Sequence, residues 1–188
     1  MRCFIAIDIP KDIKKDLHSI QKPFEKYENM TLVNTKHLHC TLIFLGEIDK
    51  TQIEKTKIIL QECSESHTAI KCQLKSTGVF PNPDYLKVIW TGISPKDQLA
   101  AIQKSLEIKL VETGLYNSLP HQQFTPHITI GRVRDSGHKH EILKEIEKNS
   151  TFTTPVFEIN ELKLKQSTLL PGGPIYDDIA VYKLREPA

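Results

Sequence analysis

The chain is best understood from two stretches, His39-Cys40-Thr41-Leu42 and His127-Ile128-Thr129-Ile130. Each places a histidine and a threonine two residues apart in an apolar run that favours a strand, over 38–45 and 127–134. Because successive side chains of a strand alternate between its faces, each imidazole shares a face with its neighbouring hydroxyl. If the two strands lie side by side, two acid–base groups and two hydroxyl donors converge, which suits phosphoryl chemistry.

The context of the two triplets adds weight to this interpretation. In a chain with eight histidines, two His-x-Thr triplets are only mildly unexpected. An aliphatic residue follows each threonine, however, and a glycine comes soon after, at Gly46 and Gly131. The copies also lie where an internal duplication would place them. Spacing alone leaves open that these are two half-buried strands that each carry a histidine.

Composition bounds the class of protein. The chain has 188 residues, 26% of them charged, with a net charge of +2, which fits one globular domain. This charge permits anionic ligands, but a protein that grips a long duplex by charge alone is usually more basic. No run approaches the ~20 apolar residues of a membrane span, and the first residues resemble a strand rather than a signal peptide. We therefore expect a cytoplasmic protein with no membrane partner.

The four cysteines form no Cys-x-x-Cys pair. Reduced thiols are the expectation for a cytoplasmic chain, although a bridge between Cys63 and Cys72 stays open. Strand alternation turns Cys40 away from the face of His39, which argues against a nucleophilic role for it.

Periodicity predicts alternating strands and helices. Turn residues at 81–84 and 171–174 join neighbouring strands directly, so we expect an α+β fold with mixed or antiparallel sheets. The predicted strands are 2–9, 38–45, 68–80, 86–93, 127–134, 152–165 and 175–184. The predicted helices are 11–27, with Pro23 ending or kinking it, 50–63, 96–112 and 138–148.

Four segments in order resemble one known family. They are Arg2–Pro10, Leu38–Gly46, Pro126–Val133 and Ser167–Tyr176, and together they span nearly the whole chain. They resemble the 2H phosphoesterases with HxTx motifs, in the branch of RNA 2′,3′-cyclic phosphodiesterases historically called 2′-5′ RNA ligases. The resemblance implies a single domain over 1–188 with two pseudo-symmetric lobes. Each lobe would lend one motif strand, 38–45 or 127–134, to a central cleft.

The resemblance also implies a reaction and its residues. The family hydrolyses RNA 2′,3′-cyclic phosphate ends to 2′-phosphates without metal or cofactor, which makes this chain an RNA-processing hydrolase. The matching positions imply His39 as proton donor and His127 as proton acceptor, with Thr41 and Thr129 binding the phosphate. The residues themselves do not fix which histidine is the acid. The expected partners are RNA with a cyclic end, such as tRNA fragments or short oligonucleotides, and a nucleotide in the cleft; we expect a monomer.

Arginines near the second motif are further candidates for phosphate binding. Strict alternation places Arg132 and Arg134 on the face opposite His127, but a bulge at Gly131 would turn Arg132 inward. We therefore include Arg132 among the candidate phosphate-binding residues.

Aromatic residues are candidates for stacking on a base. For each of Phe4, Phe44, Trp90 and Tyr176, packing in the core is the stronger expectation. His37 departs from the family, in which a small polar residue is common there. By alternation it could share the face of His39, but we expect it to face solvent.

Three other functions compete with this one. A zinc hydrolase needs three protein ligands, and His138-Lys139-His140 lies in an expected loop exposed to solvent. A non-catalytic nucleotide-binding module would have to use the same site, because the chain has no P-loop and no GxGxxG. A 2′-5′ RNA ligase shares every residue with the hydrolase, so sequence cannot separate the two.

Overall fold

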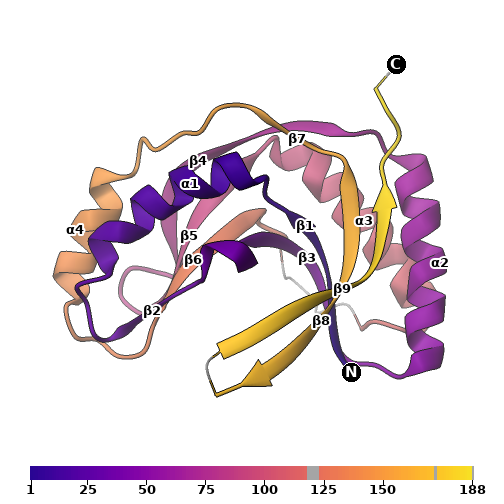
Figure 1. The fold of residues 1–188 in the computed structure, drawn as a ribbon, viewed down its shortest axis with the longest axis horizontal. Coiled ribbons are helices and arrows are strands. Elements are labelled where there is room, and N and C mark those ends of the chain that lie inside the picture. The colour runs from indigo at the N-terminus through magenta and orange to yellow at the C-terminus, as the bar shows by residue number, and fades with distance from the viewer. Residues whose placement is uncertain (118–122, 172, 188) are drawn as a thin grey trace.

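The structure is a computed structural model that describes residues 1–117, 123–171 and 173–187. Within these residues the strands form two sheets in which neighbouring strands are antiparallel (Figure 1). The first sheet has the order β3-β1-β8-β9 and contains β1 (Arg2–Asp8), β3 (His39–Glu47), β8 (Glu161–Leu170) and β9 (Gly173–Lys183). The second has the order β2-β6-β5-β4-β7 and contains β2 (Met30–Leu32), β4 (Ile70–Pro81), β5 (Leu86–Ser94), β6 (His127–Val133) and β7 (Phe157–Ile159).

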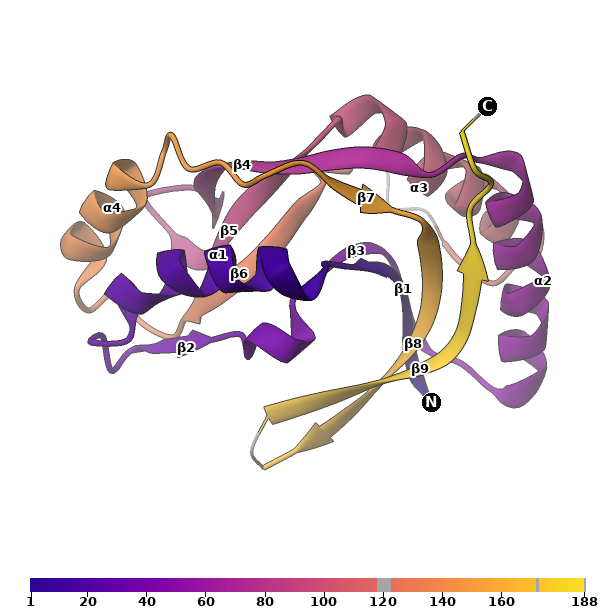
Figure 2. The same cartoon turned by 45° about the horizontal axis from the view of Figure 1, so that its top comes forward.

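Helices cover the two sheets on different sides of the molecule (Figure 2). Contacts join α1 to β6 and α4 to β4, so these two helices belong to the second sheet. Helix α2 packs on β8 and β9, and α3 contacts α2, β3 and β5, which links the two sheets. The helices are α1 (Lys11–Gln21), α2 (Lys50–Ser66), α3 (Lys96–Glu112) and α4 (Lys139–Lys148), with 3-10 turns η1 (Lys22–Phe24) and η2 (Thr35–His37).

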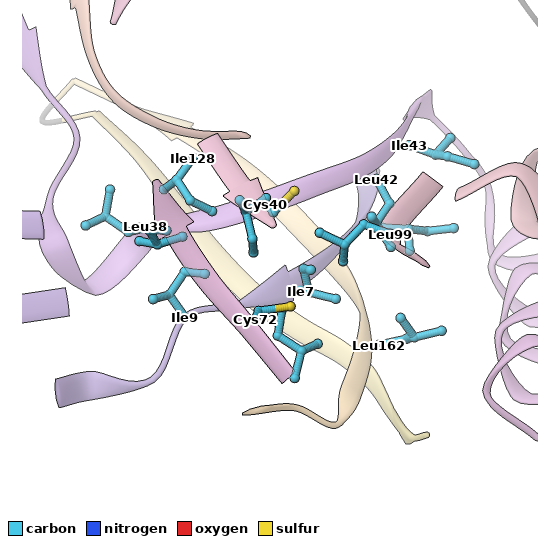
Figure 3. Packing of buried hydrophobic residues seen from close by; sticks show 14 of the residues in the cluster. Ile7, Ile9, Leu38, Cys40, Leu42, Ile43, Cys72, Leu99, Ile128 and Leu162 are labelled. Carbon is cyan, nitrogen blue, oxygen red and sulfur yellow. The ribbon is translucent and has the colours of Figure 1, made fainter. Parts of the chain in front are cut away.

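The core lies between the sheets and their helices. Alternate residues of the motif strands point into it: Figure 3 shows Cys40 and Leu42 of β3 and Ile128 of β6 among buried side chains from β1, β4, β8 and α3. Their burial is complete or nearly so. Since each strand has one face in this core, its histidine and threonine are directed to the other face.

The predicted α+β fold with two lobes is confirmed, each lobe being one sheet with its helices. The predicted helix 11–27 is shorter: α1 ends at Gln21 and a 3-10 turn follows, because Pro23 lacks an N–H and cannot continue an α-helix. The predicted strand 152–165 is divided into β7 and β8. Gly172, in the predicted 171–174 turn, lies outside the described residues. The short strand β2 was not predicted from the sequence.

No helix among the described residues is long and apolar enough to cross a membrane. All four cysteines are free and buried, so the Cys63–Cys72 bridge left open by the sequence is absent from this structure.

Candidate active site

The two motif strands come from different sheets and meet where the sheets join. β3 is the edge strand of the first sheet, and β6 lies in the second, next to β5. The strands contact one another, and the His127 backbone N–H lies within hydrogen-bond reach of the Cys40 thiol. A residue adjacent to His39 therefore touches the backbone of His127, which brings the beginnings of both motifs together. We call the surface that bears His39, Thr41, His127 and Thr129 the motif face.

Both imidazoles are held in the same way. Nδ1 of His39 lies 2.6 Å from the His37 carbonyl oxygen, and Nδ1 of His127 lies 2.7 Å from the Thr125 carbonyl oxygen. Because a carbonyl oxygen only accepts hydrogen bonds, each Nδ1 must carry a hydrogen and donate it. The neutral ring then has its lone pair on Nε2. Each backbone contact spans two residues, so the strand itself fixes the tautomer and the orientation of the ring.

Aromatic rings enclose each imidazole. The His39 ring centroid lies 5.0 Å from that of Phe4 and 5.2 Å from that of Tyr176. In the other lobe, the His127 ring lies 4.9 Å from Phe80, which in turn stacks on the Trp90 indole. These contacts leave each ring half-buried and remove much of the water that would solvate an imidazolium.

Burial therefore favours the neutral form of both histidines. It lowers the pKa of His39 to about 4, assisted by the positive charge of Lys165, against the hydrogen bond to the His37 carbonyl. The pKa of His127 is also lowered, by burial first and by the charge of Arg132. In the absence of ligand, His39 at neutral pH is a neutral imidazole that can accept a proton at Nε2.

The threonine hydroxyls are available to a ligand. Thr41 and Thr129 are half-buried on the motif face, and neither side chain hydrogen-bonds to any residue that the structure describes. A hydroxyl that is not engaged by the protein can donate to a phosphate oxygen without first breaking an internal bond.

Both motif strands carry a bulge immediately after the threonine. In β3, Thr41 and Ile43 pair with successive residues of β1, so Leu42 has no partner in β1. In β6, Thr129 pairs with Trp90 and Gly131 pairs with Ile89. These are successive residues of β5, so Ile130 has no partner in β5. A bulge shifts the alternation by one residue, so the side chain three positions after each threonine returns to the motif face.

Arg132 occupies this position in β6. It is exposed while Val133 is buried, and its charge reaches His127. A bulge, the condition for an inward Arg132, is thus present, at Ile130 rather than at Gly131. Arg134 instead donates to the Glu28 carbonyl, away from the motif.

A buried side chain holds the bulge in β6. Gln21, only 2% exposed, donates through Nε2 to the Ile130 carbonyl at 2.8 Å and to the Val33 carbonyl at 2.7 Å. The Ile130 carbonyl also accepts from the Val33 N–H at 3.0 Å. The sequence gives no signal for this role, because a glutamine near the end of an amphipathic helix is usually a surface residue.

Comparison with known proteins shows the family of the chain. Residues 9–167 match the family model described as the 2′-5′ RNA ligase superfamily. The chain belongs to the 2′-5′ RNA ligase superfamily. Among its relatives, a protein of Methanocaldococcus jannaschii named RNA 2′,3′-cyclic phosphodiesterase is 40% identical over 179 residues, 95% of this chain and 98% of the relative. One of Archaeoglobus fulgidus with the same name is 30% identical over 183 residues, 97% of this chain and 100% of the relative.

Solved structures of similar fold span the whole chain. The crystal structure of TT0787 of Thermus thermophilus has a TM-score of 0.83 at 22% identity, with 100% of both chains covered. E. coli LigT complexed with 3′-AMP has a TM-score of 0.74 at 21% identity, with 97% of both chains covered. At these identities the likeness shows the fold alone.

Two expectations about side chains of this superfamily member were wrong. Phe44 does not pack in the core: its side chain is 63% exposed, because the bulge in β3 returns it to the motif face. His37 does not face open solvent, because its half-buried ring meets Tyr176 edge-on at 5.3 Å. Phe4 is buried as expected, at 2% exposure, whereas Trp90 and Tyr176 are half-buried beside the histidines.

A ring of ion pairs lies beside His39 and was missed by sequence reasoning. Asp8, which pairs with His39 in the β1–β3 register, contacts Lys163 at 3.0 Å and Lys165 at 3.1 Å. Both lysines also contact Asp178. Burial opposes ionisation of Asp8, but the bonds from both lysines lower its pKa. In the sequence these residues resemble ordinary surface charges, yet Lys165 is only 6% exposed.

A zinc hydrolase would need a cluster of metal ligands. Within 1–117, 123–171 and 173–187, no three histidine, cysteine or acidic side chains gather at a distance that suits a metal ion. His138 and His140 are exposed, at the beginning of α4 rather than in a loop. Burial raises the pKa of the Cys40 thiol to about 12, so this sulfur is unsuited to act as a nucleophile at neutral pH.

Proposed function

We propose that this protein hydrolyses the 2′,3′-cyclic phosphodiester ends of RNA to 2′-phosphomonoesters, by acid–base catalysis from two histidines and without a metal ion. The observation that carries the proposal is the matched pair of imidazoles, each fixed by a backbone carbonyl at Nδ1 so that Nε2 is left for chemistry. The names of the M. jannaschii and A. fulgidus relatives support the same substrate.

The reaction divides between the two lobes. His127 Nε2 accepts a proton from water while the water oxygen forms a bond to phosphorus. The bond from phosphorus to the 3′ oxygen breaks, and His39 donates a proton to that oxygen. The products are a 2′-phosphate and a free 3′ hydroxyl. Each of the two proton transfers typically supplies 10²–10⁴-fold.

Hydroxyls and one guanidinium bind the phosphate in this scheme. Thr41 and Thr129 donate to its non-bridging oxygens, where negative charge develops in the transition state. Arg132, returned to the motif face by the bulge, adds a positive charge at the same end of the site. Because one chain supplies both histidines and both threonines, we propose that a monomer is active.

The bound substrate must also change the protonation of His39. A proton donor with a pKa of about 4 carries little proton at neutral pH in the free protein. A phosphate anion against the ring favours the imidazolium and so raises this pKa. We propose that substrate binding itself loads His39 with the proton that it later donates. The reverse, ligating reaction would use the same groups with their roles exchanged.

Product analysis tests the activity. An oligoribonucleotide ending in a 2′,3′-cyclic phosphate is incubated with the protein and EDTA, and the products are compared with 2′- and 3′-phosphate standards. The proposal requires a 2′-phosphate. A 3′-phosphate, or loss of turnover on adding EDTA, would contradict it. Adding an oligonucleotide with a 5′ hydroxyl to the same reaction tests whether joining competes with hydrolysis.

A sulfur substitution tests the two roles. When sulfur replaces the bridging 3′ oxygen, the leaving thiolate is a weak base and needs no protonation. His39→Ala should then lose far less activity on the sulfur substrate than on the oxygen substrate, whereas His127→Ala should lose as much on both. The opposite pattern would exchange the assignments of acid and base.

A further inference from the structure

A cavity of about 320 Å³ lies beside His127 and is not used by the reaction described above. Its walls come from the middle of β4, from β5, from the start of α3 and from the segment that precedes β6. The lining residues are Lys75, Ser76, Trp90, Gly92, Ile93, Ser94, Lys96, Thr125 and Pro126.

The cavity adjoins the second motif directly. Thr125 and Pro126, which line it, immediately precede His127, and the Thr125 carbonyl is the group that holds the His127 ring. The Trp90 ring also borders the cavity, 6.3 Å from the His127 ring. A substrate whose phosphate meets His127 can therefore extend into this cavity without crossing to another face of the protein.

The Trp90 ring packs over a glycine of the neighbouring strand. A Cβ at Gly78 would overlap carbons of the indole, and one at Gly92 would lie 3.6 Å from its edge. All three residues are on the same face of the sheet, since Gly78 pairs with Trp90 and Gly92 pairs with His127. The ring thus lies close against the strands, directly over Gly78.

The charge of the cavity is positive. Lys75 and Lys96 are exposed, and neither forms an ion pair with any residue that the structure describes. Hydroxyls of Ser76, Ser94 and Thr125 accompany them, and no carboxylate of the described residues lines the walls.

A second cavity on the side of the first motif has the opposite character. It is lined by three carboxylates and a single lysine, among apolar and amide side chains: Asp8, Glu158, Glu161 and Lys163. A polyanion is repelled there and attracted to the cavity beside His127. An RNA strand attached to the reacting nucleotide therefore has one electrostatically favourable direction.

We propose that the cavity beside His127 binds the phosphodiester group that joins the reacting nucleotide to its 5′ neighbour, through Lys75 and Lys96. This inference rests on the proposed function and names a part of its substrate. A cyclic mononucleotide lacks this phosphodiester and forgoes the contact. The site thereby favours an RNA end over a free cyclic nucleotide, because binding of a remote group contributes to stabilising the transition state.

The test compares two dinucleotides that both end in a 2′,3′-cyclic phosphate. One has the natural charged linkage and the other a neutral methylphosphonate linkage. The native protein should show a kcat/KM about tenfold higher for the charged substrate, the effect expected of one charged contact. In the double variant Lys75→Ala/Lys96→Ala the ratio should fall close to one. The dependence of log kcat/KM on log salt concentration for the charged substrate should become less steep in the double variant, because salt no longer screens a contact between lysine and phosphate.

Lys71→Ala is the matched control. It removes one positive charge from β4, the strand of Lys75, at an exposed lysine that lies outside the cavity. It should leave the ratio as in the native protein. An equal loss of activity on both dinucleotides in the double variant would place the lysines at the reacting phosphate and overturn the inference. A ratio near one in the native protein would also overturn it.

A binding measurement separates this inference from the proposed function. Trp90 is the only tryptophan in the chain and borders the cavity, so its fluorescence reports on occupancy. Titration with unreactive dinucleotides that end in a 2′-phosphate, one charged and one neutral at the internal linkage, requires no turnover. Tighter binding of the charged dinucleotide, lost in the double variant, supports the subsite even if no hydrolysis occurs. Equal binding of the two refutes it even if hydrolysis is found.

Discussion

Burial of His39 makes a quantitative prediction about stability in acid. The folded protein holds this imidazole neutral down to a pKa of about 4, whereas the ordinary value is 6.5. Above pH 6.5 neither the folded nor the unfolded state binds the proton, so protonation of His39 does not change the free energy of unfolding there. As the pH falls from 6.5 to 4, the unfolded chain binds a proton that the folded protein refuses, and stability decreases. At about 1.4 kcal/mol for each pKa unit, the loss approaches about 3 kcal/mol at pH 4.

The substitution His39→Gln removes this term. The glutamine amide cannot ionise, so the variant should lose about 3 kcal/mol less than the native protein between pH 7 and pH 4. Urea denaturation at several pH values within this range measures the difference. His140→Gln is the matched control, since an exposed imidazole is solvated in both states and should leave the native slope. Parallel slopes for His39→Gln and the native protein would show that His39 is not desolvated as described.

Three further substitutions test the supports of the site. Gln21→Leu removes the amide donor from the Ile130 and Val33 carbonyls, although the Ile130 carbonyl keeps its bond from the Val33 N–H. It should lower the free energy of unfolding by about 1–3 kcal/mol in urea denaturation, with kcat/KM falling as the bulge relaxes. Arg132→Gln should raise the pKa of His127, as measured by NMR titration, and should raise KM. An unchanged pKa of His127 would show that the guanidinium does not lie on the motif face. Gly78→Ala should cost about 1–3 kcal/mol by overpacking and change the fluorescence of the displaced indole; unchanged emission would contradict the close packing.

The parts of the site that follow a regular pattern could be predicted from the sequence. Alternation in a strand placed His39 with Thr41 and His127 with Thr129, and turned Cys40 into the core, and the structure has this arrangement. These inferences succeed because one buried face determines the direction of every side chain between the first histidine and the bulge.

The departures from regularity could not be predicted. Nothing in Leu42 or Ile130 distinguishes a bulged residue from an ordinary strand residue. The sequence therefore wrongly predicted Phe44 in the core and did not determine the face on which Arg132 lies. Long-range partners are equally hidden: Lys165 meets Asp8 across 157 residues of sequence. Such contacts depend on how the sheets are assembled, and local propensity carries no information about that assembly.

The most direct test of the account is the activity of the two histidine variants. The kcat/KM for an oligoribonucleotide with a 2′,3′-cyclic phosphate end is measured in EDTA for the native protein, His39→Ala and His127→Ala, with His140→Ala as control. The account predicts that the native protein and the control release a 2′-phosphate, and that each motif variant loses about 10²–10⁴-fold. Comparable turnover in either motif variant would contradict catalysis by two histidines.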